Sequence, residues 1–546
     1  MSERRTMEFN LADLFEIVVD VVPDRAALVA GDRRLTYGEL DRRATRFAHH
    51  LLANGIGPGD KVGIYAWNRA EWIEAELGAY KARAVPINVN YRYVTEELRY
   101  LVDNADLVGL VFERAFAPRV AEVRAATPAL RHLVVIDDGT HPSETAGPVA
   151  ALGAVPYEDA LADASPARDF ESRSPDDLYI LYTGGTTGMP KGVVWRQEGI
   201  FFAAMGGGNF AGPPCEKPED LRQLVAADHA RTIGMVNAPM MHGGGQWVTF
   251  INFYGGGTVV LNCDHHFDAD RIWRVVEREG CNSVMIVGDA MGRPLAEALA
   301  APGASYDTSR VAVIGSGGAI LSRAVKEQLR AQLPAAMVLD SFGASETGAA
   351  GTVYDMEGPA AGPKFTMGPD TTVLDDDLRP VEPGSGVVGR LAKRGHIPLG
   401  YYKDDVKTAA TVLTAADGTR WVVPGDFATV DADGTLVLLG RGSVCINTGG
   451  EKVFPEEVEA AVKSHPDVFD AVVVGVDDER FVERVAALVQ PRPGATPTLE
   501  DVQAHCRTRV AGYKVPRQLV VLEELVRTPA GKPDYRWAKA QATKES

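Results

Sequence analysis

The chain has 546 residues, of which 45% are hydrophobic and 24% charged, and its formal net charge is −18 at pH 7. This length exceeds what one hydrophobic core organises, so we expect two or more domains. The charge argues against nucleic-acid backbone binding, and five scattered cysteines without a C-x-x-C pair favour a reducing cytoplasm. The first residues lack an apolar signal region and no uncharged run approaches the length of a membrane span, so we expect a cytoplasmic protein with no integral membrane segment.

Amphipathic helical patterns alternate with short apolar strands from residue 11 to residue 112. Thr36 begins one helical pattern and Glu39 stands at the capping-box position. Residues 61–66 read as a buried strand and residues 72–82 as a helix. This alternation predicts βαβ units, and therefore an α/β fold with a largely parallel sheet. Residues 137–174, by contrast, read as an acidic, loop-rich excursion.

A hydroxyl- and glycine-rich turn follows an apolar strand at residues 178–182. Its residues suit a polyphosphate, because glycines let backbone N–H groups approach, threonines donate hydroxyls and lysine adds positive charge. The turn contains Thr183, Gly184, Gly185, Thr186, Thr187, Gly188 and Lys191. It does not fit the Walker pattern, because its glycine spacing differs and Pro190 precedes the lysine. A flexible Gly/Thr loop is the alternative.

Two further turns follow apolar strands later in the chain. The first contains Gly317, Gly318 and Ala319, and such a turn at the carboxyl end of a strand is where nucleotides bind in open α/β sheets. The second contains Ser341, Phe342, Gly343, Ser345 and Glu346. Glu346 offers a hard oxygen for Mg²⁺, although an exposed glutamate in a plain turn is the alternative.

Histidines occur in two places that attract a functional interpretation. His242 follows Pro-Met-Met and precedes three glycines. His265 and His266 stand beside Cys263 and could suggest a metal site, but no second ligand cluster follows, so we interpret them as surface residues.

These motifs, taken in order, resemble those of the adenylate-forming superfamily, which includes acyl-CoA synthetases, firefly luciferase and the adenylation domains of peptide synthetases. The resemblance covers essentially the whole chain. It is closest to the actinobacterial ligases that act on steroid side chains, over residues 182–196, 440–459 and 511–538. Among its departures from the family pattern, Gly184 replaces a serine, Phe342 a tyrosine and Ser345 a threonine.

The resemblance implies roles for the residues named above. The backbone of residues 317–319 would face the adenine, Phe342 would stack on it, and Glu346 with Thr183 would hold Mg²⁺. Asp426 would accept both ribose hydroxyls, although Pro424 replaces the family's threonine nearby. Arg441 would contact ribose or phosphate. The implied acyl pocket contains His242, Gly243, Gly244 and Gly288, with His242 gating the carboxylate or the acyl pocket; without the resemblance, a hydrogen-bonded structural histidine would be the alternative.

A second signature at residues 440–459 implies a hinge and a small cap. We expect an N-terminal adenylation domain at 1–440, a hinge at 441–444 and a mobile α+β cap at 445–546. Val444 stands where the family pivots on an acidic or lysine residue, so the pivot could move to Gly442 or Ser443. Helices at 455–463 and 498–510 and strands at 471–476 and 485–490 are expected in the cap.

The resemblance also assigns the remaining ligands. Gly449, Gly450 and Glu451 would lie beside the pantetheine arm of CoA. Lys532, on a Pro/Gly loop, would stabilise negative charge as a carboxylate attacks ATP. Lys532, Glu346, Thr183 and His242 form the expected catalytic set.

The implied activity is an ATP-dependent, AMP-forming acyl-CoA synthetase that uses ATP, Mg²⁺ and CoA. A bulky steroid side-chain or long-chain acid is the favoured substrate, and a medium-chain or aromatic acid is the alternative. CoA is expected as the thiol because the sequence ends soon after Lys532, although a separate carrier protein stays open. A nucleotide- or acyl-binding protein that has lost its chemistry is the hypothesis from another class. A homodimer also stays open.

Overall fold

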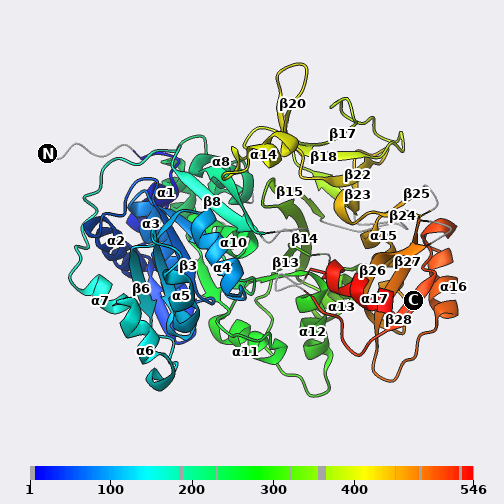
Figure 1. The fold of residues 1–546 in the computed structure, drawn as a ribbon, viewed down its shortest axis with the longest axis horizontal. Coiled ribbons are helices and arrows are strands. Elements are labelled where there is room, and N and C mark those ends of the chain that lie inside the picture. Colours follow the sequence, from blue (N-terminus) through cyan, green and yellow to red (C-terminus); the bar gives the residue numbers. More distant parts are fainter. Residues whose placement is uncertain are drawn as a thin grey trace.

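The computed structural model describes residues 7–183, 189–210, 212–228, 231–319, 321–353, 364–448, 451–478, 482–527 and 532–544. Figure 1 shows a large body in blue to yellow and a smaller C-terminal unit in orange and red at one side of it. No described helix is long and apolar enough to cross a membrane.

The N-terminal part of the body contains a parallel sheet in the order β4-β3-β5-β6-β7. Helices connect these strands, as the alternating pattern predicts. The elements are β3 (Lys61–Tyr65), α3 (Ala70–Lys81), β4 (Val85–Asn88), α4 (Thr95–Asn104), β5 (Leu107–Glu113), η1 (Arg114–Phe116), α5 (Ala117–Arg124), β6 (His132–Ile136), α6 (Pro142–Leu152), β7 (Val155–Pro156) and α7 (Tyr157–Ala162).

Two helices occupy the segment 137–174, which was expected to be loop-rich, so that prediction is wrong in part. Helix α7 forms because one of its faces is apolar: Tyr157, Ala160 and Leu161 are buried. The Tyr157 ring stacks on Phe47 with centroids 5.4 Å apart. Short helices are stabilised chiefly by such packing and are therefore hard to recognise from composition.

A second, larger sheet forms the middle of the molecule. Its first part runs β2-β1-β11-β10-β12-β13-β14, and β1 through β14 in that order pair in parallel. Its strands and associated helices are α1 (Leu11–Val21), β1 (Ala26–Ala30), β2 (Arg33–Thr36), α2 (Tyr37–Ala53), α9 (Asp220–Ala227), β10 (Ile233–Val236), α10 (Gly243–Tyr254), β11 (Thr258–Leu261), α11 (Ala269–Glu279), β12 (Ser283–Ile286), α12 (Gly288–Ala300), β13 (Val313–Gly317), α13 (Arg323–Gln332) and β14 (Met337–Ala344).

The helix start at Thr36 is confirmed. Its side chain accepts a hydrogen bond from the Glu39 N–H, while the Glu39 carboxylate accepts one from the Thr36 N–H. This reciprocal capping box satisfies backbone donors that the first turn of a helix leaves free.

The same sheet continues as antiparallel strands in the order β15-β16-β23-β22-β18-β21-β20, with β17 paired to β18. These elements are β15 (Gly348–Val353), β16 (Lys364–Met367), β17 (Thr371–Leu374), β18 (Gly389–Lys393), α14 (Asp405–Thr411), β20 (Val412–Thr414), β21 (Arg420–Val422), β22 (Asp426–Val430) and β23 (Leu436–Arg441). The fold is thus α/β with mixed sheets, as expected.

A short antiparallel sheet carries the predicted phosphate turn. It consists of β8 (Leu178–Thr183), β9 (Lys191–Arg196) and β19 (Gly400–Tyr401), in the order β19-β9-β8. After β9, the chain continues into α8 (Gln197–Ala204) and η2 (Gly206–Gly208).

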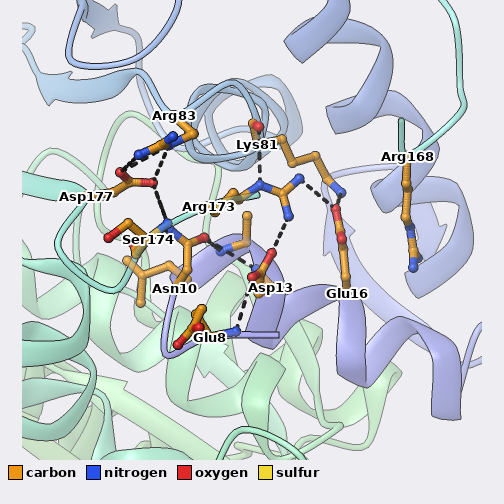
Figure 2. A network of polar contacts seen from close by, with 12 residues as sticks. Glu8, Asn10, Asp13, Glu16, Lys81, Arg83, Arg168, Arg173, Ser174 and Asp177 are labelled. Atoms are coloured by element: carbon orange, nitrogen blue, oxygen red, sulfur yellow. Dashed lines mark hydrogen bonds and ion pairs between the residues drawn. The ribbon is translucent and has the colours of Figure 1, made fainter. Parts of the chain in front are cut away.

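A buried network of charges holds the start of this hairpin, and Figure 2 shows it. Arg173 donates to Asp13 Oδ1 at 2.5 Å and to Glu16 Oε1 at 3.0 Å, while Lys81 Nζ lies 2.5 Å from Glu16 Oε1. Burial alone would raise the pKa of Glu16, but Lys81 and Arg173 hold it well below its ordinary value. Nearby, Asp177 accepts two hydrogen bonds from Arg83, at 2.8 and 3.0 Å. These contacts fix the chain immediately before β8.

The C-terminal unit has its own sheet, in the order β25-β24-β27-β26, with β28 paired in parallel to β27. Its elements are η3 (Gly442–Val444), β24 (Ile446–Thr448), β25 (Glu451–Val453), α15 (Pro455–Lys463), β26 (Val468–Asp478), β27 (Val482–Pro491), α16 (Leu499–Arg507), η4 (Gly512–Lys514), β28 (Gln518–Val521) and α17 (Tyr535–Lys544). Ile446, Val458 and Val473 belong to an apolar core formed within this unit alone. The helices and strands expected here are present, with ends shifted by a few residues.

Side-chain contacts that involve aromatic rings help to dock the unit on the body. The Arg293 guanidinium of α12 lies over the Phe469 ring, 4.9 Å from its centroid. Phe427 of β22 lies against Phe454, with ring centroids 5.7 Å apart. Both are non-covalent contacts between side chains. The chain itself passes from the body to the unit through residues 441–444, the predicted hinge.

Candidate active site

The neck of the predicted phosphate turn lies where β8 ends and β9 begins, at the turn end of the hairpin. Thr183 and Lys191 are paired across it, in the last position of the register. The Lys191 ammonium forms an ion pair with the Asp404 carboxylate. The remaining residues predicted to bind phosphate in this turn lie outside the described residues: Gly184, Gly185, Thr186, Thr187 and Gly188.

Asn88 joins this neck to the segment of the predicted acyl gate. Its side chain accepts a hydrogen bond from the Tyr182 N–H at 2.8 Å. The same amide donates to the carbonyl groups of Tyr182 and Met241, at 2.8 and 2.6 Å. Met241 precedes His242, so one buried side chain sets the spacing between two parts of the site. Sequence reasoning missed Asn88, because a lone asparagine at the end of a strand gives no signal of its partners.

The predicted adenine turn lies at the carboxyl end of β13. Gly317 is the last residue of this strand and pairs with Ser341 of β14. Gly318 follows with φ +84°, a left-handed conformation that glycine adopts at little cost, and Ala319 continues the turn. The N–H of Gly288 donates to Ser316 Oγ at 3.2 Å, which brings a predicted acyl-pocket residue beside the same strand end.

Ser341, Phe342 and Gly343 lie within β14, which ends at Ala344. The Phe342 ring packs against Phe365, with centroids 5.3 Å apart. A Cβ on Gly343 would stand 2.2 Å from the Gly348 carbonyl oxygen, so this close approach of β14 and β15 requires glycine. The turn between the two strands is then left to residues 345–347.

That turn contains Glu346, and three side chains from other elements donate hydrogen bonds to it or to its flanking residue Ala349. Tyr401 Oη donates to Glu346 Oε1 at 2.7 Å, and Trp195 Nε1 donates to the Ser345 carbonyl at 3.0 Å. Lys393 Nζ donates to the carbonyl oxygens of Thr347 and Ala349, at 2.9 and 2.6 Å. Burial lowers the pKa of Lys393 to about 8.

The donor groups near Glu346 fit Mg²⁺ better than a metal that needs a full protein cage. Among the described residues, no group of three or more His, Cys, Asp and Glu side chains is placed to hold a metal. One carboxylate and a threonine hydroxyl are hard oxygen donors, and Mg²⁺ is usually bound by one or two carboxylates plus substrate phosphates. Glu346 and Thr183 each offer an oxygen of this kind.

The predicted ribose residue begins the next hairpin. Asp426, which is 6% exposed, pairs directly with Arg441 across β22 and β23. Gly440 precedes Arg441 with φ +131°, and a Cβ there would collide with Glu456 Oε2 at 2.1 Å. The backbone therefore needs glycine immediately before the predicted hinge.

The site includes a contribution from the C-terminal unit. His242 is the N-cap residue of α10, and its Nε2 atom is buried without a hydrogen-bond partner among the described residues. Burial lowers the pKa of His242 to about 4, and the positive charges of Lys532 and Arg92 act in the same direction. The imidazole is thus neutral at physiological pH. The charge of Lys532, in the unit that follows the hinge, reaches His242 in the body.

The two glycines after His242 differ in their surroundings. A Cβ on Gly243 would meet Leu181 and Trp247 side-chain atoms at 2.8 Å, whereas a Cβ on Gly244 would meet nothing within 4 Å. Open space therefore lies beside α10 next to His242. Of the predicted CoA residues, Gly449 and Gly450 lie outside the described residues, and Glu451 is the first residue of β25.

A cavity of about 210 Å³ lies elsewhere in the body, lined by residues that include Trp67, Arg69, Cys263 and His265. Several of its charged groups are already paired, as in the contact of Arg69 with Glu113 at 3.1 Å. His265 stacks on Trp67 with centroids 4.3 Å apart. None of the residues predicted to bind ATP, acid or CoA lines this cavity.

Family models identify the architecture that joins these elements. The model described as AMP-binding enzyme matches residues 15–402, and the model of the AMP-binding enzyme C-terminal domain matches residues 457–532. The chain belongs to the AMP-binding enzyme family. The resemblance expected from the motifs is confirmed, and the two matches flank the predicted hinge.

Relatives in this family are similar over nearly their whole length. A medium/long-chain-fatty-acid--CoA/3-oxocholest-4-en-26-oate--CoA ligase of Mycolicibacterium smegmatis is 49% identical, over 98% of this chain and 96% of that protein. A 3-oxocholest-4-en-26-oate--CoA ligase of Rhodococcus rhodochrous is 48% identical with the same coverage. The medium-chain acyl-CoA ligase Mig of Mycobacterium avium is 43% identical, over 98% of this chain and 99% of its own.

Solved structures confirm the fold. The anthranilate CoA ligase AuaEII in complex with anthranoyl-AMP superposes with a TM-score of 0.82 at 21% identity, over 99% of this chain and 98% of that one. ATP-bound MatB from Rhodopseudomonas palustris gives a TM-score of 0.77 at 24% identity, over 98% and 99%.

Proposed function

We propose that this AMP-binding enzyme is an ATP-dependent, AMP-forming acyl-CoA synthetase. One arrangement supports it most: the Asn88 amide binds the neck of the phosphate turn to the segment of His242, whose pKa is lowered in part by the positive charge of Lys532 in the small unit. A cation that arrives there from a separate unit can stabilise charge in one half-reaction and leave in the next. The names of the relatives point to the same activity.

In the first half-reaction, a carboxylate oxygen of the acid attacks the α-phosphorus of ATP. The bond from the α-phosphorus to the bridging oxygen breaks, pyrophosphate leaves, and an acyl-adenylate forms. Lys532 offsets the negative charge that develops on the phosphoryl oxygens, which is most effective where water is excluded. Neutral His242 borders the acid without repelling Lys532. When bound, Mg²⁺ would neutralise phosphate charge, with Glu346 and Thr183 as its protein ligands.

Other residues hold the nucleotide during this step. We assign the adenine to Phe342 and the backbone of residues 317–319, the ribose to Asp426 and Arg441, and the phosphates to the turn that begins at Thr183. A carboxylate can accept both ribose hydroxyls in parallel, which suits buried Asp426.

In the second half-reaction, the sulfur of CoA attacks the acyl carbon of the adenylate, the bond from acyl carbon to phosphate oxygen breaks, and AMP leaves. We propose that residues 1–440 and 445–546 move relative to each other about 441–444. Gly449, Gly450 and Glu451 would then replace Lys532 beside the adenylate. Changes of φ and ψ at a few residues suffice for such hinge motion.

The acid we favour is a steroid side-chain or long-chain carboxylic acid. Two relatives at 48–49% identity are named for 3-oxocholest-4-en-26-oate, and the open space at Gly244 would admit a bulky group. A medium-chain acid is the second candidate, since Mig carries that name at 43% identity.

The test is a substrate panel with ATP, Mg²⁺ and CoA, in which pyrophosphate and the mass of the thioester are measured. Steroid side-chain and long-chain acids should give acyl-CoA and AMP at the highest kcat/KM. Nucleotide binding without pyrophosphate release for any acid would instead indicate a binding protein that has lost its chemistry, as the departures at Gly184, Pro424 and Val444 suggest.

A further inference from the structure

Residues 400–404, Gly-Tyr-Tyr-Lys-Asp, contact two of the predicted ATP-site residues from one short stretch of chain. Tyr401 Oη donates to Glu346 Oε1 at 2.7 Å, and Asp404 pairs with Lys191. Glu346 and Lys191 lie on different elements, after β14 and at the start of β9. The segment therefore fixes the position of one group relative to the other.

The backbone of the segment is firmly attached beside the phosphate turn. Gly400 and Tyr401 pair with Val194 and Val193 of β9. The Tyr402 N–H donates to the Gly192 carbonyl at 2.8 Å, next to Lys191. Tyr401 therefore belongs to the same sheet as the strands that flank the phosphate turn, since β19 and β8 both pair with β9.

The outer side of the segment is tied to a different part of the body. Tyr402 Oη and Lys403 Nζ donate to the two oxygens of Asp106, at 2.8 and 2.7 Å. Lys403 has φ +52°, a conformation that is uncommon without glycine and persists where surrounding contacts enforce it. The backbone bends there, so Tyr401 and Asp404 reach the site while Tyr402 and Lys403 reach Asp106.

We propose that Tyr401 is a positioning residue that orients the Glu346 carboxylate for the metal–nucleotide complex. The inference rests on the proposed function in assigning Mg²⁺ to Glu346. A phenol O–H that occupies one carboxylate oxygen fixes the plane of the group and directs the other oxygen. Hydrogen-bond partners of metal-binding carboxylates act in this way, and their loss usually costs about 10- to 100-fold in metal affinity or activity.

Tyr401→Phe is the test, and Tyr402→Phe is its matched control. Each change deletes one phenolic hydroxyl from adjacent residues, but the first bond goes to Glu346 and the second to Asp106. The first measurement is the dissociation constant of a non-hydrolysable ATP analogue with and without Mg²⁺, by titration calorimetry. Tyr401→Phe should reduce the gain in affinity that Mg²⁺ confers about 10-fold or more, with little change in its absence.

The control should retain the Mg²⁺-dependent gain of the wild type. An unchanged gain in Tyr401→Phe, or an equal loss in both variants, would overturn the proposal. In the pyrophosphate assay, the Mg²⁺ concentration that gives half the maximal rate should rise for Tyr401→Phe, while kcat at saturating Mg²⁺ stays close to that of the wild type. A fall in kcat alone contradicts a role through the metal site.

A double-mutant comparison separates positioning from folding. If Tyr401 acts through Glu346, Tyr401→Phe should cause no further loss of Mg²⁺-dependent affinity in a Glu346→Gln background. Additive losses would show that Tyr401 acts elsewhere. Because calorimetry needs no turnover, it gives an answer even if no acid is activated, so failure of the proposed function and failure of this inference are distinguishable.

Discussion

The two ends of strand β8 lie in very different environments. Before its first residue, the chain is held by the buried network of Figure 2, in which Glu16 and Arg173 each make two ion-pair contacts. Lys81 pairs with Glu16 and also with Asp41. Beyond its last residue, Thr183, lie the half-exposed ammonium of Lys191, which pairs with Asp404, and the buried Nε2 of His242, which has no hydrogen-bond partner among the described residues. One end is saturated with partners, and the other retains groups that a ligand can engage.

This difference indicates that the residues that stabilise the fold lie before β8, whereas the residues available to a ligand lie beyond its other end. A saturated network limits movement of the hairpin base, so the turn at its far end is presented from a fixed support. Substitutions at one end of β8 or the other test this separation. If the separation holds, each change should affect either stability or reaction, but not both.

The largest effect is expected in the buried network. Glu16→Gln should lower the free energy of unfolding by about 3–5 kcal/mol, because it leaves the charges of Lys81 and Arg173 buried without compensation. Glu96→Gln, which breaks an exposed pair with Arg99, should cost about 0–1 kcal/mol. Urea unfolding at pH 7 measures both. Equal losses in the two variants would show that the buried network contributes no more to stability than an exposed ion pair.

The pH dependence of that difference has a definite sign. The folded-state pKa of Glu16 lies below its ordinary value of 4.5, so its stabilising contribution is fully present above about that pH. It is lost as the pH falls through the lower, folded-state pKa. The difference in free energy of unfolding between the wild type and Glu16→Gln should therefore be constant from pH 6 to 8 and become smaller at acidic pH.

At the reactive end, Lys532→Ala should slow adenylate formation by about 10²- to 10³-fold, since a donor to transition-state charge is removed. Thioester formation from pre-made acyl-adenylate should persist. Lys539→Ala is the control, because Lys539 is an exposed lysine of the same unit that pairs with Glu483 at 3.2 Å. Equal losses in both half-reactions of Lys532→Ala would contradict the use of two cap orientations.

Asp426→Ala should raise the KM for ATP about 10- to 100-fold through the loss of hydrogen bonds from ribose to a charged acceptor. Asp431→Ala, in the turn after the same strand, is the comparison. Initial rates at varied ATP measure the effect. An unchanged KM in Asp426→Ala would place the ribose elsewhere.

The smallest effect concerns the shape of the acyl pocket. Gly244→Leu should lower kcat/KM for steroid and long-chain acids about 10-fold and spare short acids, because its side chain would enter the open space beside His242. Competition between a long and a short acid, with both thioesters measured by mass, gives this ratio directly. A uniform loss for every acid would assign Gly244 to helix packing instead.

Local features of the fold could be predicted from sequence, whereas contacts across it could not. The capping box at Thr36 and the strand before Thr183 depend on neighbouring residues, and both are present. Helix α7 was missed because its stability comes from packing on Phe47, far away in sequence. Single motifs could therefore predict roles for Glu346 and Asp426, but not the residues that surround them.

The site shows the same limit. Tyr401 stands 55 positions after Glu346, and no spacing rule connects them. Asn88 likewise contacts Tyr182 and Met241, which are 94 and 153 positions away. Pairing of β-strands brings these residues together, and strand order cannot be read from periodicity alone.

We propose that the body holds one nucleotide site and that Lys532 of the cap completes it. A crystal structure with a non-hydrolysable acyl-adenylate analogue tests it most directly. We expect the adenine against Phe342, the ribose hydroxyls at Asp426 and the phosphate between Thr183 and either Lys532 or the segment 449–451. An adenosine bound away from Phe342, with Lys532 remote from the phosphate in every cap orientation observed, would contradict it.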